Sequence, residues 1–237
     1  MHNPKSNDQT LYHVDYQPLW LTLKLALVTT GCLLLVGIPI AAGLARSKSK
    51  FKPVLEAFIS LPLVLPPSVL GFYLLLAFSP ANGLGKILES VFNIRLVFSF
   101  TGLVISSIIY SLPFMVHPVQ AGLEALPGSL RDASRTLGKS AWQTFMQVLL
   151  PNIKPALLTG TILTFAHTLG EFGLVLMIGG NIPGVTKVAS IAIYDEVESL
   201  HFQSAHIYAG ILLVVSFIIL LTVYFTNKKL FKSSMPV

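Results

Sequence analysis

Charged residues are scarce in this chain of 237 residues, making up 11% of it, whereas typical soluble globular domains carry about 25%. Hydrophobic residues make up 53% of the chain, and its mean hydropathy is +0.73. This composition excludes a soluble globular domain and predicts a protein of the lipid bilayer. The single cysteine, Cys32, excludes a disulfide bond within the chain. No internal repeat or flexible linker divides the sequence, so we predict one all-α membrane domain.

Several chemistries lack the residues that they need. The chain has no G-x-x-x-x-G-K-[ST] phosphate-binding loop, so it cannot hydrolyse ATP in the manner of P-loop enzymes. The predicted spans hold no nucleophile and base at a recognisable spacing, so we do not expect an enzyme. His167 and Glu171 stand four apart on one expected helical face, but two ligands do not make a metal site, and we predict none. The net charge of +6 is spread beside the spans, which argues against nucleic-acid binding.

Five hydrophobic windows approach the roughly 20 residues that a helix needs to cross a bilayer. They cover residues 19–44, 54–78, 101–119, 153–178 and 207–226, and a short sixth helix between residues 178 and 206 is an alternative. The first window follows the polar stretch MHNPKSNDQTLYHVDYQP and is too long for the core of a signal peptide, so we expect it to be retained. The predicted organisation is an external segment (1–18), a transmembrane domain (19–226) and a cytoplasmic tail (227–237).

Basic residues indicate the orientation of the spans, because lysine and arginine accumulate in short cytoplasmic loops. Most of them lie on one side of the predicted membrane: after the first window, between the third and fourth, and after the fifth. The other side carries an acidic group at Asp195, Glu196 and Glu198. We therefore expect a multi-pass membrane protein with its N-terminus outside the cell, and with its C-terminus and residues 120–151 in the cytoplasm.

The longest interruption between windows contains DASRTLGKSAWQTFMQVLLP, residues 132–151. Its spacing predicts two short helices, the first beginning after a proline-glycine turn with Ser129 as N-cap and ending at Gly138. The second, capped by Ser140, has amphipathic spacing at Trp142, Phe145, Met146 and Leu149. Periodicity alone leaves two interpretations open: an amphipathic anchor on the membrane surface, or a rigid docking element for a cytoplasmic partner.

The order of residues in this loop favours docking. Asp132-Ala133-Ser134 is followed after three residues by Gly138, and after nine more by Val148, one residue and Leu150-Pro151. The loop therefore resembles the EAA loop of the permease subunits of ATP-binding-cassette importers, which reads Glu-Ala-Ala, three residues, Gly, nine residues, Ile, any residue, Leu-Pro. The departures, Asp for Glu, Ser for Ala and Val for Ile, are conservative in charge, size or shape.

This resemblance implies a type I importer permease fold, in which the loop is a coupling helix seated in a groove of a separate ATPase subunit. The contact would involve Arg131, Asp132, Ala133, Ser134, Arg135, Gly138, Lys139, Leu150 and Pro151. Asp132 would support the helix start and make polar contacts, and Gly138 would allow the bend. The resemblance also implies a homodimer of permease chains, two ATP-binding subunits that use ATP and Mg²⁺, and an external substrate-binding protein. No cofactor is expected on this chain.

Two further stretches, FISLPLVLPPSVLGFYLL at 58–75 and LTFAHTLGEFGLVLMIGGNIPGVTKVASIAIYDEVE at 163–198, look like the molybdate branch of that family. With the loop, the resemblance covers residues 19–226 and implies import of molybdate by alternating access. Tungstate and sulfate permeases have similar stretches, so these oxyanions are alternative substrates. An ion-coupled secondary transporter is the alternative from another class, but it would need paired buried ionisable residues, and only His167 and Glu171 are available.

Two places within the windows are candidates for the translocation path or gate. Pro62, Pro66 and Pro67 remove backbone donors from the second window and predict a broken helix, with a mere kink as the alternative. Gly170-Glu171-Phe172-Gly173 places a carboxylate between glycines, which let helices bend or approach closely. A carboxylate is a poor ligand for a divalent oxyanion, so we expect a structural or gating role for Glu171. The hydroxyl groups of Ser106, Ser107, Ser111 and Thr164 either bond within helices or line a pore.

Overall fold

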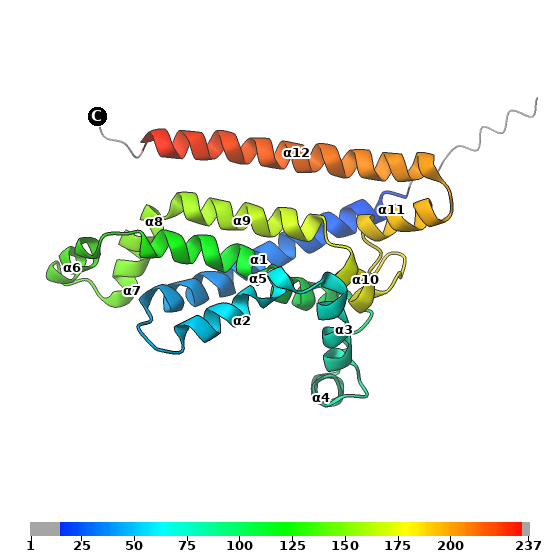
Figure 1. Ribbon diagram of the computed structural model, residues 1–237, viewed down its shortest axis with the longest axis horizontal. Helices are drawn as coiled ribbons and strands as arrows, with labels where there is room; N and C mark the ends of the chain where they lie inside the picture. The colour runs from blue at the N-terminus through cyan, green and yellow to red at the C-terminus, as the bar shows by residue number, and fades with distance from the viewer. Residues whose placement is uncertain (1–14, 234–237) are drawn as a thin grey trace, which may run out of the picture.

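Helices dominate the computed structural model, which describes residues 15–233 (Figure 1). They are α1 (Gln17–Arg46), α2 (Lys52–Val64), α3 (Pro67–Phe78), α4 (Gly83–Phe92), α5 (Phe100–Glu124), α6 (Gly128–Thr136), α7 (Ala141–Thr144), the π-helix η1 (Phe145–Leu149), α8 (Leu150–Asn152), α9 (Lys154–Leu169), α10 (Gly173–Gly179), α11 (Ala189–Glu198) and α12 (Phe202–Ser233). No strand occurs within the described residues, in agreement with the all-α prediction. Most of the predicted external segment, residues 1–14, lies outside the described range.

Up to five parts of the described chain are long and apolar enough to cross a membrane, when each bent pair of helices is taken as one span. Three are continuous helices, α1, α5 and the first part of α12, and they correspond to the first, third and fifth windows. The bent pairs are α2 with α3, at 112°, and residues 141–152 with α9, at 76°. The short helix α11 lies between residues 178 and 206, where a sixth helix was the alternative.

Two helices end elsewhere than their windows do. α9 ends at Leu169, inside the fourth window, and the chain re-enters a helix only at Gly173. α12 continues beyond the fifth window, through residue 227 to Ser233.

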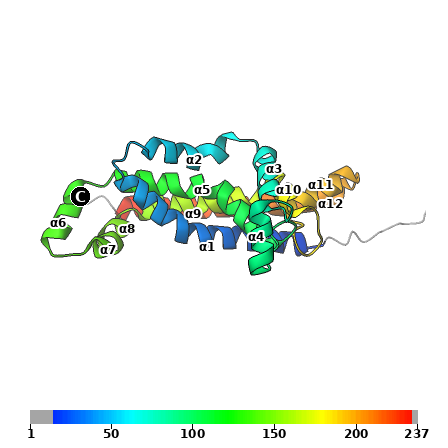
Figure 2. The same cartoon turned by 90° about the horizontal axis from the view of Figure 1, so that it is seen from below.

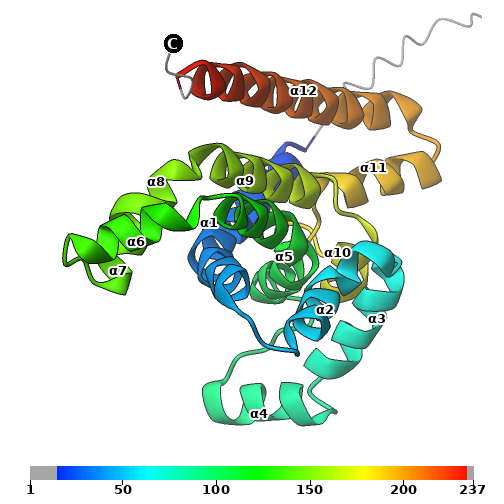
Figure 3. The same ribbon diagram turned by 60° about the vertical axis from the view of Figure 1, so that its left-hand side comes forward.

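The helices α1, α5 and α9 pack against one another and form the centre of the molecule. On the outside of this bundle, α2 packs against α5, while α12 packs against α9 and α11 (Figures 1 and 3). The short helices α6, α7 and α8 lie at one end, and α3, α4 and α10 lie at the other (Figures 1 and 2). The two regions singled out in the sequence are therefore separated along the bundle.

Two apolar cores follow one another along the bundle, with polar side chains between them. The core near α7 includes Leu33, Ala41, Met115, Val119, Phe145 and Leu149. The core near α10 includes Leu21, Leu25, Leu103, Val175, Ile178 and Ile191. On α1, α5 and α9, the positions between these cores hold the buried polar residues Thr29, Thr30, Ser106, Ser107, Ser111, Thr164 and Thr168. Polar groups at this depth of a membrane bundle are candidates for function.

Local sequence signals account for the start of α5. The Ser99 hydroxyl oxygen accepts a hydrogen bond from the backbone N–H of Gly102 at 3.1 Å, as an N-cap does. Position 102 requires glycine, because a Cβ atom there would lie 1.8 Å from the carbonyl oxygen of Leu96. The chain can thus enter α5 directly from the preceding turn.

Candidate functional site

The loop between α5 and α9 contains two short helices that meet at Gly138. This residue has a φ of +74°, and a Cβ atom there would meet nothing within 4 Å, so backbone conformation rather than crowding favours glycine. The Ser140 side chain accepts a hydrogen bond from the N–H of Gln143 at 3.2 Å, and the Gln143 side chain accepts one from the N–H of Ser140 at 2.9 Å. This capping box confirms the predicted cap at Ser140, and the φ of Gly138 agrees with the predicted helix end.

The predicted start of α6 is wrong. Its N-cap is Pro127, with φ −57° and ψ 137°, and the helix begins at Gly128, so Ser129 already lies in the first turn. Proline fixes its own φ near −65° and cannot continue a preceding helix, which makes it a natural point of entry. Asp132 consequently lies beyond the first turn, where it does not support the helix start as expected.

A hydrogen bond between two buried hydroxyl groups holds α6 against α7. The Oγ atom of Ser134 lies 2.8 Å from Oγ1 of Thr144, and the two residues are 3% and 5% exposed. The Lys139 ammonium group, next to the bend, donates to the side-chain oxygen of Gln147 on η1. These contacts make α6, the bend and α7 one structural unit.

The second helix of the loop differs from the amphipathic α-helix expected there. Only α7 is α-helical, and residues 145–149 continue as a π-helix. Phe145 and Leu149 are buried, whereas Trp142 and Met146 are exposed, so the four residues do not form the single apolar face that their spacing predicted. Pro151 does not open the following span, because it belongs to α8 and a non-helical residue, Ile153, separates α8 from α9.

The outer surface of α6 carries small and polar side chains. Asp132, Ala133 and Arg135 are exposed, and Leu137, which directly follows the helix, is 77% exposed. Leu150 and Pro151 lie in α8, beyond α7 and η1. Of the contact residues predicted in α6, Asp132, Ala133 and Arg135 are therefore exposed, whereas Ser134 is 3% exposed and faces Thr144, so it cannot make the predicted contact.

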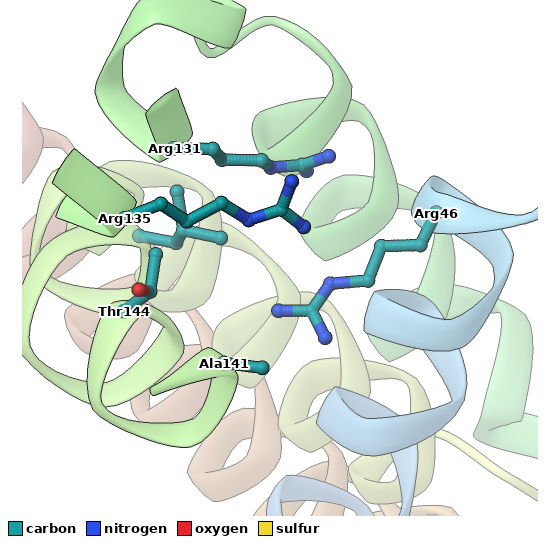
Figure 4. A pocket seen from close by; sticks show the side chains of 6 residues that line it. Arg46, Arg131, Arg135, Ala141 and Thr144 are labelled. Carbon is teal, nitrogen blue, oxygen red and sulfur yellow. The ribbon is translucent and has the colours of Figure 1, made fainter. Parts of the chain in front are cut away.

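Two arginines of α6 turn toward the end of α1. Figure 4 shows the side chains of Arg131, Arg135 and Arg46 directed into a common pocket, whose volume is about 230 Å³. Ala141 and Thr144 of α7 and Leu149 of η1 complete its lining. Arg131 and Arg135 were predicted contact residues of the loop, but no feature of the sequence indicates that Arg46 would join them.

The second predicted span breaks after Val64. Pro66, with ψ 138°, is the N-cap of α3, and Pro67 is the first residue of that helix. The broken helix was predicted, but Pro62 does not cause the break, because α2 continues past it for two residues. The 112° bend between α2 and α3 is far larger than a kink.

A second break separates α9 from α10 and contains Glu171. Gly170 ends α9, and Phe172, with φ −125° and ψ −63°, precedes α10. At Gly173 a Cβ atom would lie 3.1 Å from Cβ of Pro67, so the first residues of α10 and α3 are in close contact. The two breaks, which lie far apart in the sequence, therefore meet in space, although only the first was predicted.

A cavity of about 560 Å³ lies where the two breaks meet. Its lining includes the predicted residues Pro67, Gly170, Glu171 and Gly173, together with Ser68, Tyr110, Ala166, His167 and Phe172. Pro62 and Pro66 are not part of that lining. The cavity combines hydroxyl groups, an imidazole ring and one carboxylate, and no lysine or arginine lines it.

Hydrogen bonds from α5 hold the polar side chains of this cavity. Ser107 Oγ donates to Oε2 of Glu171 at 3.0 Å, and Ser111 Oγ is hydrogen-bonded to Nδ1 of His167 at 2.9 Å. Ser107 and Ser111 thus bond between helices, whereas Ser106 bonds within α5, to the carbonyl oxygen of Gly102 at 2.6 Å. The spacing of four residues between Ser107 and Ser111, which places them on one helical face, was the available signal for this arrangement.

His167 both packs against an aromatic ring and lines the cavity. Its ring stacks on Phe114 with the ring centroids 4.1 Å apart. The expectation that His167 and Glu171 share a helical face is wrong, because α9 ends between them. Within residues 15–233, no group of three or more histidine, cysteine, aspartate or glutamate side chains is arranged to hold a metal ion.

A family model and individual relatives both match transport permeases. Residues 34–232 match the family described as "Binding-protein-dependent transport system inner membrane component". The molybdenum transport system permease protein ModB of Azotobacter vinelandii is 44% identical over 214 residues, which are 90% of this chain and 95% of that protein. A probable sulfate transport system permease protein, cysT of Marchantia polymorpha, is 37% identical over 207 residues, 87% of this chain and 70% of that protein.

Solved structures share the fold at low sequence identity. A bacterial ABC transporter involved in the import of the acidic polysaccharide alginate matches with a TM-score of 0.70 and 18% identity, over 91% of this chain and 80% of that chain. The MetNI methionine ABC transporter in an inward-facing conformation matches with a TM-score of 0.69 and 16% identity, over 96% and 99%. These similarities confirm the importer permease fold that the loop sequence predicted.

Proposed function

We propose, on the premise that this chain belongs to the family of binding-protein-dependent transport system inner membrane components, that it is the permease subunit of an ATP-driven importer of molybdate. The observation that carries the choice of anion is the 44% identity to ModB of Azotobacter vinelandii over 90% of this chain. Sulfate is the second candidate, because a probable sulfate permease is 37% identical over 87% of the chain. Tungstate, a divalent oxyanion like molybdate, is tested beside it.

The loop at residues 120–151 is proposed to couple this chain to an ATPase subunit. Its exposed α6 surface, with Asp132 and Ala133, supports a contact between rigid elements, because Ser134 and Thr144 hold the helix in place. By the resemblance of the loop to the EAA sequence, Lys139, Leu150 and Pro151 also belong to this contact. The side chains of Arg131 and Arg135, which the same resemblance assigns to it, turn into the pocket beside α1 instead.

The cavity between the two helix breaks is the proposed translocation path. An oxyanion in this cavity could accept hydrogen bonds from the hydroxyl groups of Ser68 and Tyr110. The N-terminal end of α3 also favours an anion there. The absence of lysine and arginine from the lining suits passage, since a strongly cationic site would retain a divalent anion. Glu171 would repel the anion, so its proposed role is to hold or gate the break rather than to bind substrate.

The proposed assembly is a homodimer of this chain with two ATP-binding subunits and an external substrate-binding protein. The ATP-binding subunits would bind ATP and Mg²⁺, since this chain lacks a phosphate-binding loop. The proposed orientation puts residues 1–18 outside the cell and residues 120–151 and 227–237 in the cytoplasm. The distribution of lysine and arginine supports this orientation.

ATPase measurements on the reconstituted complex test the choice of anion. The permease is combined with its ATPase and binding protein in vesicles and titrated with molybdate, tungstate and sulfate in turn. Stimulation by molybdate and tungstate at concentrations where sulfate is inert is the expected result. Stimulation by sulfate alone would retain the mechanism and change the substrate, whereas no dependence on an ATPase partner would overturn the proposal.

Variants of the loop test coupling separately from substrate choice. Gly138→Pro is expected to abolish transport, because proline cannot adopt a φ of +74°. Ala133→Glu, a bulky and charged change on exposed α6, is also expected to abolish it, while Ala133→Ser retains it. Both inactive variants should remain in the membrane fraction. Normal uptake by either variant would show that the loop is not the ATPase contact.

A further inference from the structure

Beside α6, the arginine-lined pocket adjoins an apolar groove of about 680 Å³. The two cavities share Arg46 and Ala141 in their linings. Apart from Arg46 and the indole N–H of Trp142, the side chains along the groove are apolar, among them Leu34, Leu35, Ile38, Phe145 and Met146. One continuous depression therefore has a cationic end and a hydrophobic length.

The three arginines at the cationic end have no acidic partner. None of Arg46, Arg131 and Arg135 is within ion-pair distance of a carboxylate in the part of the chain that the structure describes. The guanidinium group of Arg46 lies over the ring of Phe145, 5.5 Å from its centroid, at the boundary of pocket and groove. Three like charges that face one pocket repel one another, so an anion bound among them would stabilise the arrangement.

The groove extends from this charged end along a membrane span. Arg46 is the last residue of α1, and the lining continues back along the helix to Leu34, a distance of about 18 Å at 1.5 Å per residue. The groove is open to its surroundings, since Leu35 is 78% and Trp142 is 68% exposed. A tryptophan beside basic residues at the end of a span is typical of the membrane interface.

We propose that the pocket and the groove form one binding site for an anionic phospholipid. The phosphate group accepts hydrogen bonds from Arg46, Arg131 and Arg135, and one acyl chain lies in the groove along α1. A carboxylate from a protein partner would satisfy the arginines but would leave the groove empty, whereas a phospholipid fills both parts. Basic pockets beside transmembrane helices are known to hold anionic headgroups. This site is separate from the proposed translocation path, and the bound lipid joins the end of α1 to α6.

Quenching of tryptophan fluorescence tests this proposal on the full-length chain. The sequence contains two tryptophans, Trp20 and Trp142, so Trp20→Phe leaves only the tryptophan that lines the groove. This variant is placed in phosphatidylcholine vesicles that contain a small fraction of phosphatidylglycerol with brominated acyl chains, which quench nearby indole rings. Half-maximal quenching is expected at a clearly lower mole fraction than with brominated phosphatidylcholine. Millimolar inorganic phosphate should leave this preference in place, because it has no acyl chain to occupy the groove.

Single charge removals identify the headgroup contacts. Arg46→Gln and Arg135→Gln are each expected to raise the half-quenching mole fraction of phosphatidylglycerol about fivefold. Lys48→Gln is the matched control, because Lys48 is exposed near Arg46 but lines neither cavity, and it should leave the preference unchanged. If Arg46→Gln aggregates during size-exclusion chromatography, Arg135→Gln tests the same contact from an exposed position on α6.

Three results would overturn the lipid site. Equal quenching by both lipids would show that the groove does not select a headgroup. An equal effect of Lys48→Gln and Arg46→Gln would show that the lipid preference arises from the general positive charge of the surface and not from this pocket. Loss of the preference when the ATPase subunit is added would assign the arginines to the protein contact instead.

Discussion

Ser107 on α5 donates a hydrogen bond to Glu171, which lies in the break between α9 and α10, with 3.0 Å between the oxygen atoms. Glu171 is 5% exposed, and its other carboxyl oxygen has no hydrogen-bond partner among the described residues. The backbone carbonyl oxygen of the same residue accepts a hydrogen bond from Ser190 Oγ on α11 at 2.6 Å. Glu171 therefore connects the break to two neighbouring helices, as a residue that holds or gates the path would.

Glu171→Gln is predicted to change the transport rate or the basal ATPase activity without changing which anion is preferred. Glutamine has the same shape and still accepts a hydrogen bond from Ser107, but unlike glutamate it cannot gain or lose a proton. Uptake of molybdate in competition with sulfate measures both quantities in one assay. An altered molybdate-to-sulfate preference would contradict the structural role and indicate direct contact with substrate.

Ser107→Ala provides the companion measurement on stability. Its expected effect is a loss of about 1–3 kcal/mol in the free energy of unfolding, because a buried carboxylate loses a side-chain donor. Ser106→Ala is the matched control, since Ser106 is equally buried and bonds only within its own helix. Equal destabilisation by the two variants would show that the bond to Glu171 adds nothing specific.

Gly173→Ala is predicted to destabilise the junction of the two breaks, whereas Gly170→Ala is not. A Cβ atom at Gly173 would lie 3.1 Å from Cβ of Pro67, but at Gly170 the nearest atom would be 3.9 Å away. Overpacking of this kind costs about 1–3 kcal/mol, and it would also narrow the cavity. Thermal unfolding in detergent and anion uptake in vesicles measure the two effects. Equal behaviour of the two variants would mean that α3 and α10 separate easily.

Features that depend on neighbouring residues in the chain could be predicted from the sequence. Ser140 caps a helix because Gln143 follows at the required spacing, and Gly138 takes a positive φ that other residues avoid. The five windows follow from hydrophobicity alone. The resemblance of residues 132–151 to the EAA loop supplied the family before any geometry was available.

Features that depend on tertiary contacts could not be predicted. Pro62 and Pro67 are both prolines in one window, but α2 runs through the first and α3 begins at the second. The packing of α3 on α10, which lies far along the chain, is likewise absent from the local sequence. In the same way, Arg46 lines the pocket with Arg131 and Arg135 although it belongs to α1, far from α6 in the sequence.

Gly138→Val is predicted to impair coupling more than Gly138→Asn. The site is open, so the cost arises from the backbone: φ is +74°, and the left-handed region disfavours branched residues but tolerates asparagine. The valine variant is expected to lose about 1–2 kcal/mol of loop stability. The stimulation of ATPase activity by substrate, measured for both variants, reports the coupling. If valine and asparagine behave alike, α6 does not depend on the bend.

The Ser134–Thr144 hydrogen bond is predicted to hold α6 in its orientation. In a double-mutant cycle with Ser134→Ala and Thr144→Val, the two hydroxyl groups should show a coupling energy of about 1 kcal/mol, as expected for a buried neutral hydrogen bond. Hydrogen exchange of the α6 amides, compared with that of the α5 amides in the same sample, measures the local effect. Faster exchange in α6 alone, with reduced ATPase stimulation, would show that the ATPase is coupled through a rigid loop. Faster exchange with unchanged stimulation would mean that contact with the ATPase itself orders α6.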